Sequence, residues 1–331
     1  MSYFMRSVEL KNYRIFKRLK ISELSQINII GGLNGVGKTT FLEALFTMID
    51  IGSVNSILRP FGFRRLPSDS TYLFNDTNSN IKLFGNTTSG DLNIEIHCKS
   101  NVFNGESVSS KIIPNMYTVE GSFYGNEFKY TYNNGVSFGT QPYIFKKGMM
   151  INQVTKFSPL EDTSRLSEIK KNGDSNYISL VENLKLINDD VLGLEIFVLG
   201  DQPVIHCKMV NGKTLPAPLL GDGVQTLLSI LLAIYGVEDG CVFIDEFESS
   251  IHYKLLENIW GIISRVAKEK TCQLFVATHS RECINSAAEG VCDDISMQYI
   301  RLDKNSLGDI VPVVYTRDDL LNANYFDAEV R

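Results

Sequence analysis

Apolar residues divide the first 50 residues of the chain into short strands and a helix. Residues 3–22 carry apolar side chains at the spacing of two short strands. Residues 27–30 form a short apolar run followed by glycines, which is typical of a strand buried on both faces. Residues 41–48 then carry the apolar stripe of a helix. This order predicts a strand, a glycine-rich loop and a helix.

Residues 51–203 have a different pattern, in which Asn, Ser, Gly and Thr separate short alternating runs. The alternating runs predict β-strands at residues 81–85, 92–98, 111–121, 126–132 and 141–145. Residues 133–135, Asn-Asn-Gly, are a hairpin turn signal. Residues 162–190 have a helical pattern, and residues 191–200 return to a strand.

From residue 204 onward the chain again alternates strands and helices. Strands are expected at residues 204–210, 241–246, 273–280, 296–303 and 309–316. Residues 223–236 predict a strongly apolar helix that ends at Gly236. Residues 251–270 predict an amphipathic helix with cations near its C-terminal end, where the helix dipole favours them.

The composition is that of a globular protein, because 44% of the 331 residues are apolar and 21% are charged. It excludes a disordered chain, a collagen-like repeat and a small disulfide scaffold. The length alone fits about two domains. The formal net charge of −6 argues against a dedicated nucleic-acid coat or a membrane-surface binder. It leaves a local basic patch open.

None of the six cysteines belongs to a C-x-x-C pair, so the sequence signals neither a zinc ribbon nor a redox dithiol. His97-Cys98 and His206-Cys207 are neighbours on predicted strands, and such neighbours point to opposite faces. We expect reduced, buried thiols. The first residues lack a signal-peptide pattern, and no apolar window is long enough to cross a membrane. We therefore expect a cytoplasmic protein without membrane contact.

Residues 32–39 match the phosphate-binding pattern G-x-x-x-x-G-K-S/T, between the buried strand and the helix. Glycines there let backbone N–H groups surround phosphate oxygens, and the helix N-terminus adds positive potential. Lys38 should bridge the β- and γ-phosphates of ATP, and the Thr39 hydroxyl should ligate Mg²⁺. The residues expected to bind the nucleotide are Gly32, Asn34, Gly35, Val36, Gly37, Lys38, Thr39 and Thr40. The alternative is a glycine-rich turn without a ligand.

Asp245 and Glu246 follow the apolar run Cys241–Ile244, which carries them to the C-terminal edge of a sheet. We expect Asp245 to hold Mg²⁺ and Glu246 to act as the general base that polarises the attacking water. The alternative is two acids in a solvated turn. His279 ends the next buried strand and could hydrogen-bond the γ-phosphate, against the alternative of a structural histidine. Ser280 could cap the following helix.

A glycine signature, Leu220 to Gln225, opens the apolar helix before Asp245. With the order P-loop, long insert, signature, Asp-Glu strand and strand-His, the chain resembles the ATP-binding-cassette ATPases. Within them it is similar to the chromosome-maintenance (SMC) and RecF-like heads. The segments LLGDGVQTLL, VFIDEFESSIHY and FVATHSRECI look most like stand-alone prokaryotic ATPases of the RecF/overcoming-lysogenization-defect kind found in phage-defence operons.

The resemblance implies that two heads enclose two ATP molecules, so that the signature of one subunit faces the γ-phosphate held by the other. Asp222 and Gly223 would then bind nucleotide in trans, in a dimer or a ring of dimers. The sequence departs from the common L-S-G-G-Q form, because Gly221 takes the serine place and Asp222 a glycine place. Asp222 and Gln225 instead fit a capping box. An ordinary capped core helix is the alternative.

Three other assignments rest on the same resemblance. The stretch Glu248, Ser249, Ser250 and His252 would lie at the dimer interface, or form an ordinary loop and helix start. The glutamine that links the two lobes would be Gln141 or Gln153. Arg14 would contact nucleotide by family position, or be a surface arginine.

The motif order predicts an α/β fold of the ABC-ATPase type, with mixed sheets and a head that is discontinuous in sequence. We expect residues 1–50 and 204–331 to form this P-loop head and residues 51–203 to form an inserted α+β lobe. Basic and aromatic residues mix in the insert around Arg59, Arg64 and Arg65. They leave a nucleic-acid contact and a protein interface open. The insert has no heptads, so we expect no coiled-coil arm.

These expectations describe an ATPase that binds Mg-ATP, oligomerises around the nucleotide and switches a separately encoded effector, such as a nuclease or a toxin, in phage defence. Alternatives are a non-hydrolysing scaffold held together by ATP and a DNA repair or maintenance ATPase of RecF type. An ATP-gated nuclease is disfavoured, because about 50 residues follow His279 and Asp293-Asp294 lacks D-x-D spacing. The long insert disfavours a transporter motor.

Overall fold

A computed structural model describes residues 4–51, 57, 59, 70–76, 78–98, 116–123, 125–133, 136–140, 148–152 and 158–325. The chain divides into two compact units. The first unit comprises Met1–Leu24, Gly32–Lys147 and Arg301–Val313, and the second comprises Ser25–Gly31, Gly148–Ile300 and Val314–Arg331. This division does not follow the expected boundaries at residues 50 and 203.

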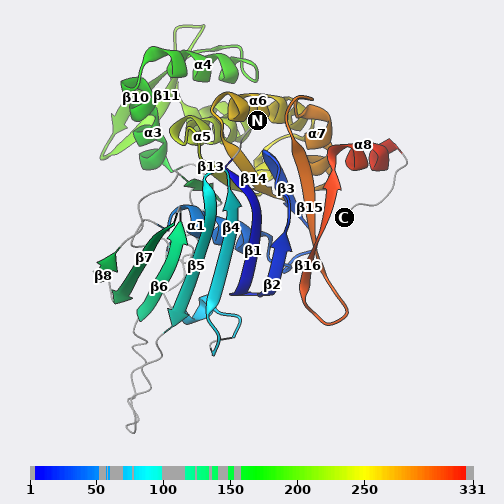
Figure 1. Cartoon of the computed structure of the whole chain (residues 1–331). Helices are drawn as coiled ribbons and strands as arrows, with labels where there is room; N and C mark the ends of the chain where they lie inside the picture. The colour runs from blue at the N-terminus through cyan, green and yellow to red at the C-terminus, as the bar shows by residue number, and fades with distance from the viewer. Residues whose placement is uncertain are drawn as a thin grey trace, which may run out of the picture. The chain divides into compact units, whose positions relative to one another are not determined.

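A seven-stranded antiparallel sheet dominates the first unit, with the strand order β2-β1-β4-β5-β6-β7-β8 (Figure 1). Its strands are β1 (Met5–Tyr13), β2 (Phe16–Ile21), β4 (Ile81–Thr87), β5 (Gly90–Cys98), β6 (Met116–Phe123), β7 (Asn126–Asn133) and β8 (Val136–Thr140). Strand β1 pairs with β4, so that Leu10 faces Leu83 in the ladder. This pairing joins the start of the chain to the segment that the sequence pattern assigned to an insert.

The strands expected at 3–22, 81–85, 92–98 and 126–132 are confirmed. Strand β6 begins at Met116, and residues 111–115 of the strand expected at 111–121 lie outside the described residues, as does the strand expected at 141–145. Asn133 pairs with Val136 across β7 and β8, so two residues connect these strands, as the hairpin signal predicts.

Helix α1 (Lys38–Ile49) follows the glycine-rich loop, and eleven of its twelve residues are buried. Its C-terminal half lies against the seven-stranded sheet, because a Cβ atom added to Gly85 of β4 would come within 3.1 Å of the Met48 methyl group. The helix is therefore fixed by packing along nearly its whole length, which gives the loop before it a rigid support.

A six-stranded sheet has the order β16-β15-β3-β14-β13-β9. Its strands are β3 (Ile27–Gly31), β9 (Gly148–Ile151), β13 (Cys241–Asp245), β14 (Gln273–Ala277), β15 (Met297–Lys304) and β16 (Ile310–Thr316). Strands β3, β14, β13 and β9 run parallel to one another. Buried parallel strands read as continuous apolar runs, which is why β3, β13 and β14 are recognisable in the sequence.

The second unit also holds a three-stranded sheet and six helices within the described residues. The sheet contains β10 (Val191–Leu199), β11 (Gln202–Met209) and β12 (Thr214–Pro216). The helices are α3 (Pro159–Lys171), α4 (Asp174–Lys185), α5 (Asp222–Gly236), α6 (Tyr253–Glu269), α7 (Arg281–Gly290) and α8 (Arg317–Tyr325). The helical pattern expected at 162–190 is thus two helices, separated at Gly173, whose φ is +123°.

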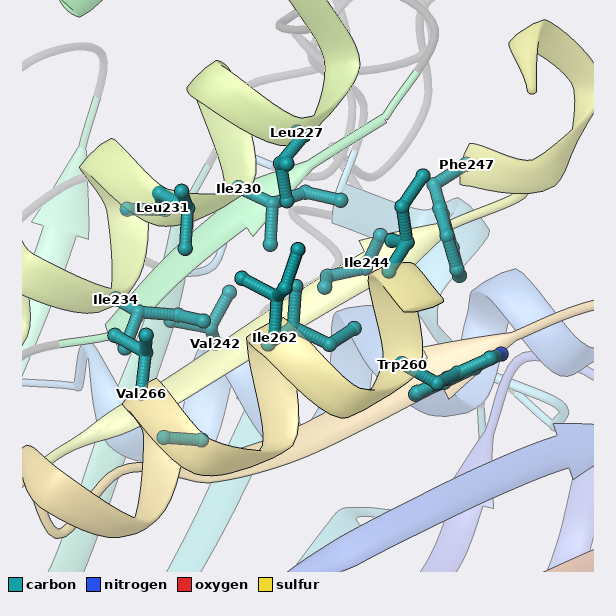
Figure 2. Packing of buried hydrophobic residues seen from close by; sticks show 14 of the residues in the cluster. Leu227, Ile230, Leu231, Ile234, Val242, Ile244, Phe247, Trp260, Ile262 and Val266 are labelled. Atoms are coloured by element: carbon teal, nitrogen blue, oxygen red, sulfur yellow. The ribbon is translucent and has the colours of Figure 1, made fainter. Parts of the chain in front are cut away.

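The core of the second unit lies where α5 and α6 pack against β13 (Figure 2). Side chains of α5 such as Leu227 and Ile230 point toward Val242 and Ile244 of β13 and toward residues of α6. Trp260 of α6 is fully buried, and its indole N–H donates to the carbonyl oxygen of Cys283 at 3.2 Å. This packing fixes the strand that carries the two acidic residues.

Candidate nucleotide site

The loop between β3 and α1 depends on three glycines with positive φ. Gly32, Gly35 and Gly37 have φ values of +122°, +82° and +95°, which L side chains rarely adopt. A Cβ atom at Gly37 would also lie 2.8 Å from the Ile15 methyl carbon Cγ2. Conformation and crowding therefore both require glycine at position 37. The glycines of the G-x-x-x-x-G-K-S/T pattern thus stand where the backbone of the loop needs them.

Lys38 folds back over this loop. Its Nζ donates to the carbonyl oxygens of Gly32 at 2.9 Å and of Leu33 at 3.2 Å, and the residue is 8% exposed. Leu33, Asn34 and Gly35 are exposed, whereas Val36 is buried and anchors the loop. The ammonium group is thus held within the loop, next to the backbone that the sequence predicts to surround phosphates.

The residues after Gly37 fit a nucleotide with a divalent cation. Gly37 is the N-cap of α1 and has no side chain to cap the helix, and the positive potential of a helix N-terminus favours an anion at this position. Thr39 and Thr40 lie in this first turn. A loop of backbone donors, a lysine and a threonine hydroxyl is a donor set that suits a triphosphate and Mg²⁺.

The acidic strand lies two strands from β3 in the parallel sheet of the second unit. In the ladder Ile30 of β3 pairs with Ala277 of β14, and Ala277 pairs with Asp245 of β13. The carboxyl ends of the three strands therefore reach the same level at one edge of the sheet. This is the edge at which open α/β sheets bind ligands.

Glu246 leaves the strand in a strained turn. It has φ +53° and ψ +46°, a left-handed conformation that is uncommon for residues other than glycine. Its N–H donates to the carbonyl oxygen of Ala277 at 3.0 Å, which holds the turn against β14. Such outliers concentrate at functional sites, because the surrounding structure must stabilise them.

His279 and Glu246 come together, although 33 positions separate them in the sequence. The His279 Nδ1 lies 3.2 Å from the Glu246 Oε1, and the two side chains are 55% and 30% exposed. His279 thus contacts the predicted general base at the surface, and its contact with the γ-phosphate stays a prediction. Ser280 caps α7 as the sequence predicts, because its Oγ accepts from the Cys283 N–H at 3.1 Å.

The signature segment differs from the expected capping box. Helix α5 begins at Asp222, its N-cap is Gly221 with φ +94°, and no side chain hydrogen-bonds to the cap. Asp222 is exposed inside the first turn, and Gly223 follows it. The prediction that Asp222 caps the helix was therefore wrong, because glycine tolerates the positive φ that precedes this helix and takes the N-cap position.

Arg14 pairs with α1 in the first unit. Its Nη1 lies 2.6 Å from the Glu43 Oε2, and the Glu43 side chain is fully buried. Arg14 is therefore part of the support of α1 and not a free surface arginine. Gln141 and Gln153, the two candidates for the lobe-linking glutamine, lie outside the described residues.

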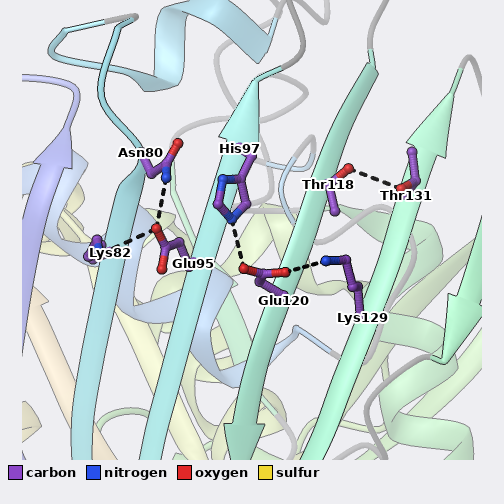
Figure 3. A network of polar contacts seen from close by, with 8 residues as sticks. All are labelled: Asn80, Lys82, Glu95, His97, Thr118, Glu120, Lys129 and Thr131. Atoms are coloured by element: carbon purple, nitrogen blue, oxygen red, sulfur yellow. Dashed lines mark hydrogen bonds and ion pairs between the residues drawn. The ribbon is translucent and has the colours of Figure 1, made fainter.

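The described residues contain one cluster with metal-ligand chemistry, Glu95, His97 and Glu120 on β5 and β6 (Figure 3). Lys82 lies 3.3 Å from Glu95, Lys129 lies 2.6 Å from Glu120, and His97 Nε2 lies 3.1 Å from Glu120. Each carboxylate already has a cationic partner, so we interpret the cluster as a balanced polar network on the sheet.

No helix among the described residues combines the length and the apolar character that crossing a membrane requires.

A family model described as "AAA domain" matches residues 7–189, which is more than half of the chain. A second, described as "AAA domain, putative AbiEii toxin, Type IV TA system", matches residues 154–285. An ATP/GTP phosphatase of Helicobacter pylori is 25% identical over 332 residues, covering 85% of this chain and 86% of that protein. The DNA replication and repair protein RecF of Idiomarina loihiensis is 38% identical over 63 residues, 19% of this chain and 17% of that protein.

Solved structures show the same fold. An SMC head bound to the C-winged helix domain of ScpA has a TM-score of 0.56 at 13% identity. The match covers 95% of this chain and 98% of the SMC chain. A second match is an SMC head of Pyrococcus furiosus, which has an extended coiled coil and is bound to the C-terminal domain of ScpA. Its TM-score is 0.55 at 11% identity, and the match covers 99% of this chain and 100% of the SMC chain. The fold class is therefore confirmed. The chain belongs to the AAA-domain family and has the fold of the SMC heads.

Proposed function

We propose that this protein binds Mg-ATP at the Gly32–Thr40 loop and hydrolyses it with Glu246 as the general base. The register of the parallel sheet carries this proposal. Asp245, Ala277 and Ile30 lie in one row, and the glycine loop begins one residue after β3 ends. Because the loop follows β3 directly in the chain, it begins at the sheet edge where Asp245, Glu246 and His279 follow their own strands.

Each residue has a separate part in this proposal. Lys38 would exchange its two backbone carbonyl partners for phosphate oxygens, since an ammonium group pairs more strongly with an anion than with a carbonyl. Thr39 and Asp245 would hold Mg²⁺. When bound, the ion neutralises the charge of the phosphates. Glu246 would accept a proton from the attacking water.

His279 would report on the γ-phosphate. Its Nδ1 faces Glu246, and the half-exposed ring leaves the other nitrogen free to donate to a phosphate oxygen. Donation from Nδ1 to the Glu246 carboxylate and from the other nitrogen to a phosphate oxygen requires the protonated ring, because neutral imidazole donates from only one nitrogen. The pair would thus couple the general base to a sensor of the bound nucleotide.

We further propose that two copies assemble around ATP, with Asp222 and Gly223 of one copy at the phosphates of the other. The helix start at Gly221 supports a contact through backbone N–H groups, because no side chain caps it. Asp222 is an exposed carboxylate there, so we expect a weaker trans contact than a serine hydroxyl would give.

The assembled state would switch a separately encoded effector, such as a nuclease or a toxin, in the cytoplasm and in phage defence. The match to a model described with AbiEii toxins of type IV toxin–antitoxin systems supports this setting. The SMC heads with the same fold are bound to ScpA, which supports partner binding. A DNA repair role of RecF type is the second candidate, and the matched RecF segment of 63 residues favours it.

The test is steady-state ATP hydrolysis by the wild type and by Lys38→Ala. We expect turnover to fall by at least about 100-fold in Lys38→Ala, because the phosphates lose their one lysine partner in the loop. Lys20→Ala is the matched control, because Lys20 is an exposed residue of β2 outside the loop, and its turnover should equal that of the wild type. Equal turnover by the wild type and Lys38→Ala would refute the proposal.

A further inference from the structure

Glu248 is a buried carboxylate in the 3₁₀ turn Phe247–Ser250, directly after the acidic pair. It is 8% exposed, and its Oε1 accepts from the Thr278 hydroxyl. Its Oε2 is buried and makes no hydrogen bond to any described residue. Burial raises the pKa of Glu248, because a charged carboxylate loses its hydration there. Burying this carboxylate destabilises the folded protein, so its place in the turn needs a structural explanation.

Thr278 joins three parts of the second unit. Its N–H donates to the carbonyl oxygen of Ile30 at 3.0 Å, at the end of β3. Its Oγ1 accepts from the Ser280 N–H at 3.0 Å and donates to Glu248. The residue is fully buried. A single hydroxyl therefore connects the turn after β13 to the turn after β14. His279 lies between Thr278 and Ser280 in the sequence, so the bond between these two residues spans it.

We propose that Glu248 is a positioning residue: through the Thr278 hydroxyl it fixes the β14–α7 turn, and thereby holds His279 against Glu246. This inference rests on the proposed hydrolysis. The Glu246 N–H bond to Ala277 fixes one end of the same junction, and the Glu248–Thr278 bond fixes the other. Together they set the 3.2 Å contact between His279 and Glu246.

Glu248 does not act as a second general base. Both the residue and its unbonded oxygen are buried, so it cannot reach a water molecule at a nucleotide on the exposed edge. The titratable groups around it are Glu246, His279 and the buried thiol Cys283. Of these, Glu246 and His279 are the pair whose geometry the junction controls.

Kinetic constants of four variants test this role. Glu248→Ala and Thr278→Val each remove one side of the bond, and we expect kcat to fall about 10- to 100-fold because the reacting groups lose their alignment. The KM for ATP should change by less than about twofold, since the glycine loop is untouched. Glu248→Gln and Thr278→Ser keep an acceptor and a hydroxyl, and they should retain most of the activity.

The double variant Glu248→Ala/Thr278→Val should lose no more than Thr278→Val alone, because Thr278→Val already removes the bond to Glu248 together with the Ser280 contact. Glu238→Ala, at an exposed residue before β13, is the matched control and should leave kcat unchanged. Unchanged kcat in Glu248→Ala, or equal losses in Glu248→Ala and Glu248→Gln, would overturn the proposal. So would a rise in KM that equals the fall in kcat.

Amide hydrogen exchange of residues 278–283 gives a second readout that needs no hydrolysis. We expect faster exchange in Glu248→Ala and Thr278→Val, where the Ser280 amide loses its ordered acceptor, and wild-type exchange in Glu248→Gln. Unchanged exchange in Glu248→Ala would refute the junction. A wild type without ATPase activity would instead refute the proposed function, and the exchange data would still decide whether Glu248 orders the turn.

Discussion

At the scale of single residues, three carboxylates have pKa values that burial raises, and they lower the stability of the folded protein when they are charged. Asp50 ends α1, where burial raises its pKa to about 6 and Arg59, 3.0 Å away, opposes this shift. Asp162 of α3 and Glu248 are buried in the second unit, and burial raises both of their pKa values. Such groups destabilise the folded state when they are charged.

The raised pKa of Asp50 should make the free energy of unfolding depend on pH. Its folded-state pKa of about 6 lies above the ordinary value of 3.8, so the folded state binds the proton more tightly than the unfolded chain does. The stabilisation is complete below about pH 4 and is lost as the pH rises to about 6. Asp50→Asn should remove this dependence and raise the free energy of unfolding at pH 7 by about 1 kcal/mol.

Urea unfolding of the wild type and Asp50→Asn at pH 4, 5, 6 and 7 measures this difference. The gap between the two proteins should widen up to about pH 6 and then stay constant. A gap that is the same at every pH would contradict the assignment.

At the scale of elements, the sequence predicts segments whose structure is set locally. The P-loop, β13 and β14 were predictable, because glycine spacing and continuous apolar runs have one common structural meaning. Strand β9 (Gly148–Ile151) was not, since four residues carry too little pattern and its pairing with β13 creates the strand. The Glu248–Thr278 bond also escaped prediction, because it joins residues 30 positions apart through the fold.

Helices α3 and α5 are held together by a buried polar contact that has a measurable energy. The Ser229 hydroxyl donates to the Asp162 Oδ2 at 2.8 Å, and Arg165 lies 3.0 Å from the other carboxylate oxygen. Ser229→Ala leaves a buried carboxylate with one donor fewer. We expect the free energy of unfolding to fall by about 1–3 kcal/mol.

Chemical denaturation of Ser229→Ala and Ser264→Ala tests this contact. Ser264 is equally buried, but its hydroxyl lies near the Gly261 carbonyl oxygen and the Cys292 thiol rather than a carboxylate, so its replacement should cost less. Equal losses in the two variants would show that the link between α3 and α5 adds nothing.

At the scale of the whole molecule, the fold class was predictable from the motif order, but the pairing of strands that are distant in sequence was not. The β1–β4 pairing and the pairing of β9 with β13 bring distant segments into shared sheets, and no local pattern encodes such pairing. The division into a head of residues 1–50 and 204–331 and an inserted lobe of residues 51–203 stays a prediction.

Nucleotide-dependent assembly is the prediction that belongs to this scale. The chain has a mass of 37.1 kDa, and light scattering after gel filtration measures the mass of the assembly. We expect Mg-ATP to raise this mass at least twofold in Glu246→Gln, which should bind ATP without turnover. Lys38→Ala should show the same mass with and without ATP. A mass that never depends on ATP would reject assembly around the nucleotide.

ATP binding and turnover by Glu246→Gln, measured on the same preparation, test the role of Glu246 most directly. Glutamine keeps the size of the side chain but cannot accept a proton from water. We expect an unchanged dissociation constant for ATP and a turnover about 100- to 10,000-fold below that of the wild type. A variant that hydrolyses ATP at the wild-type rate would contradict the assignment of Glu246 as the general base.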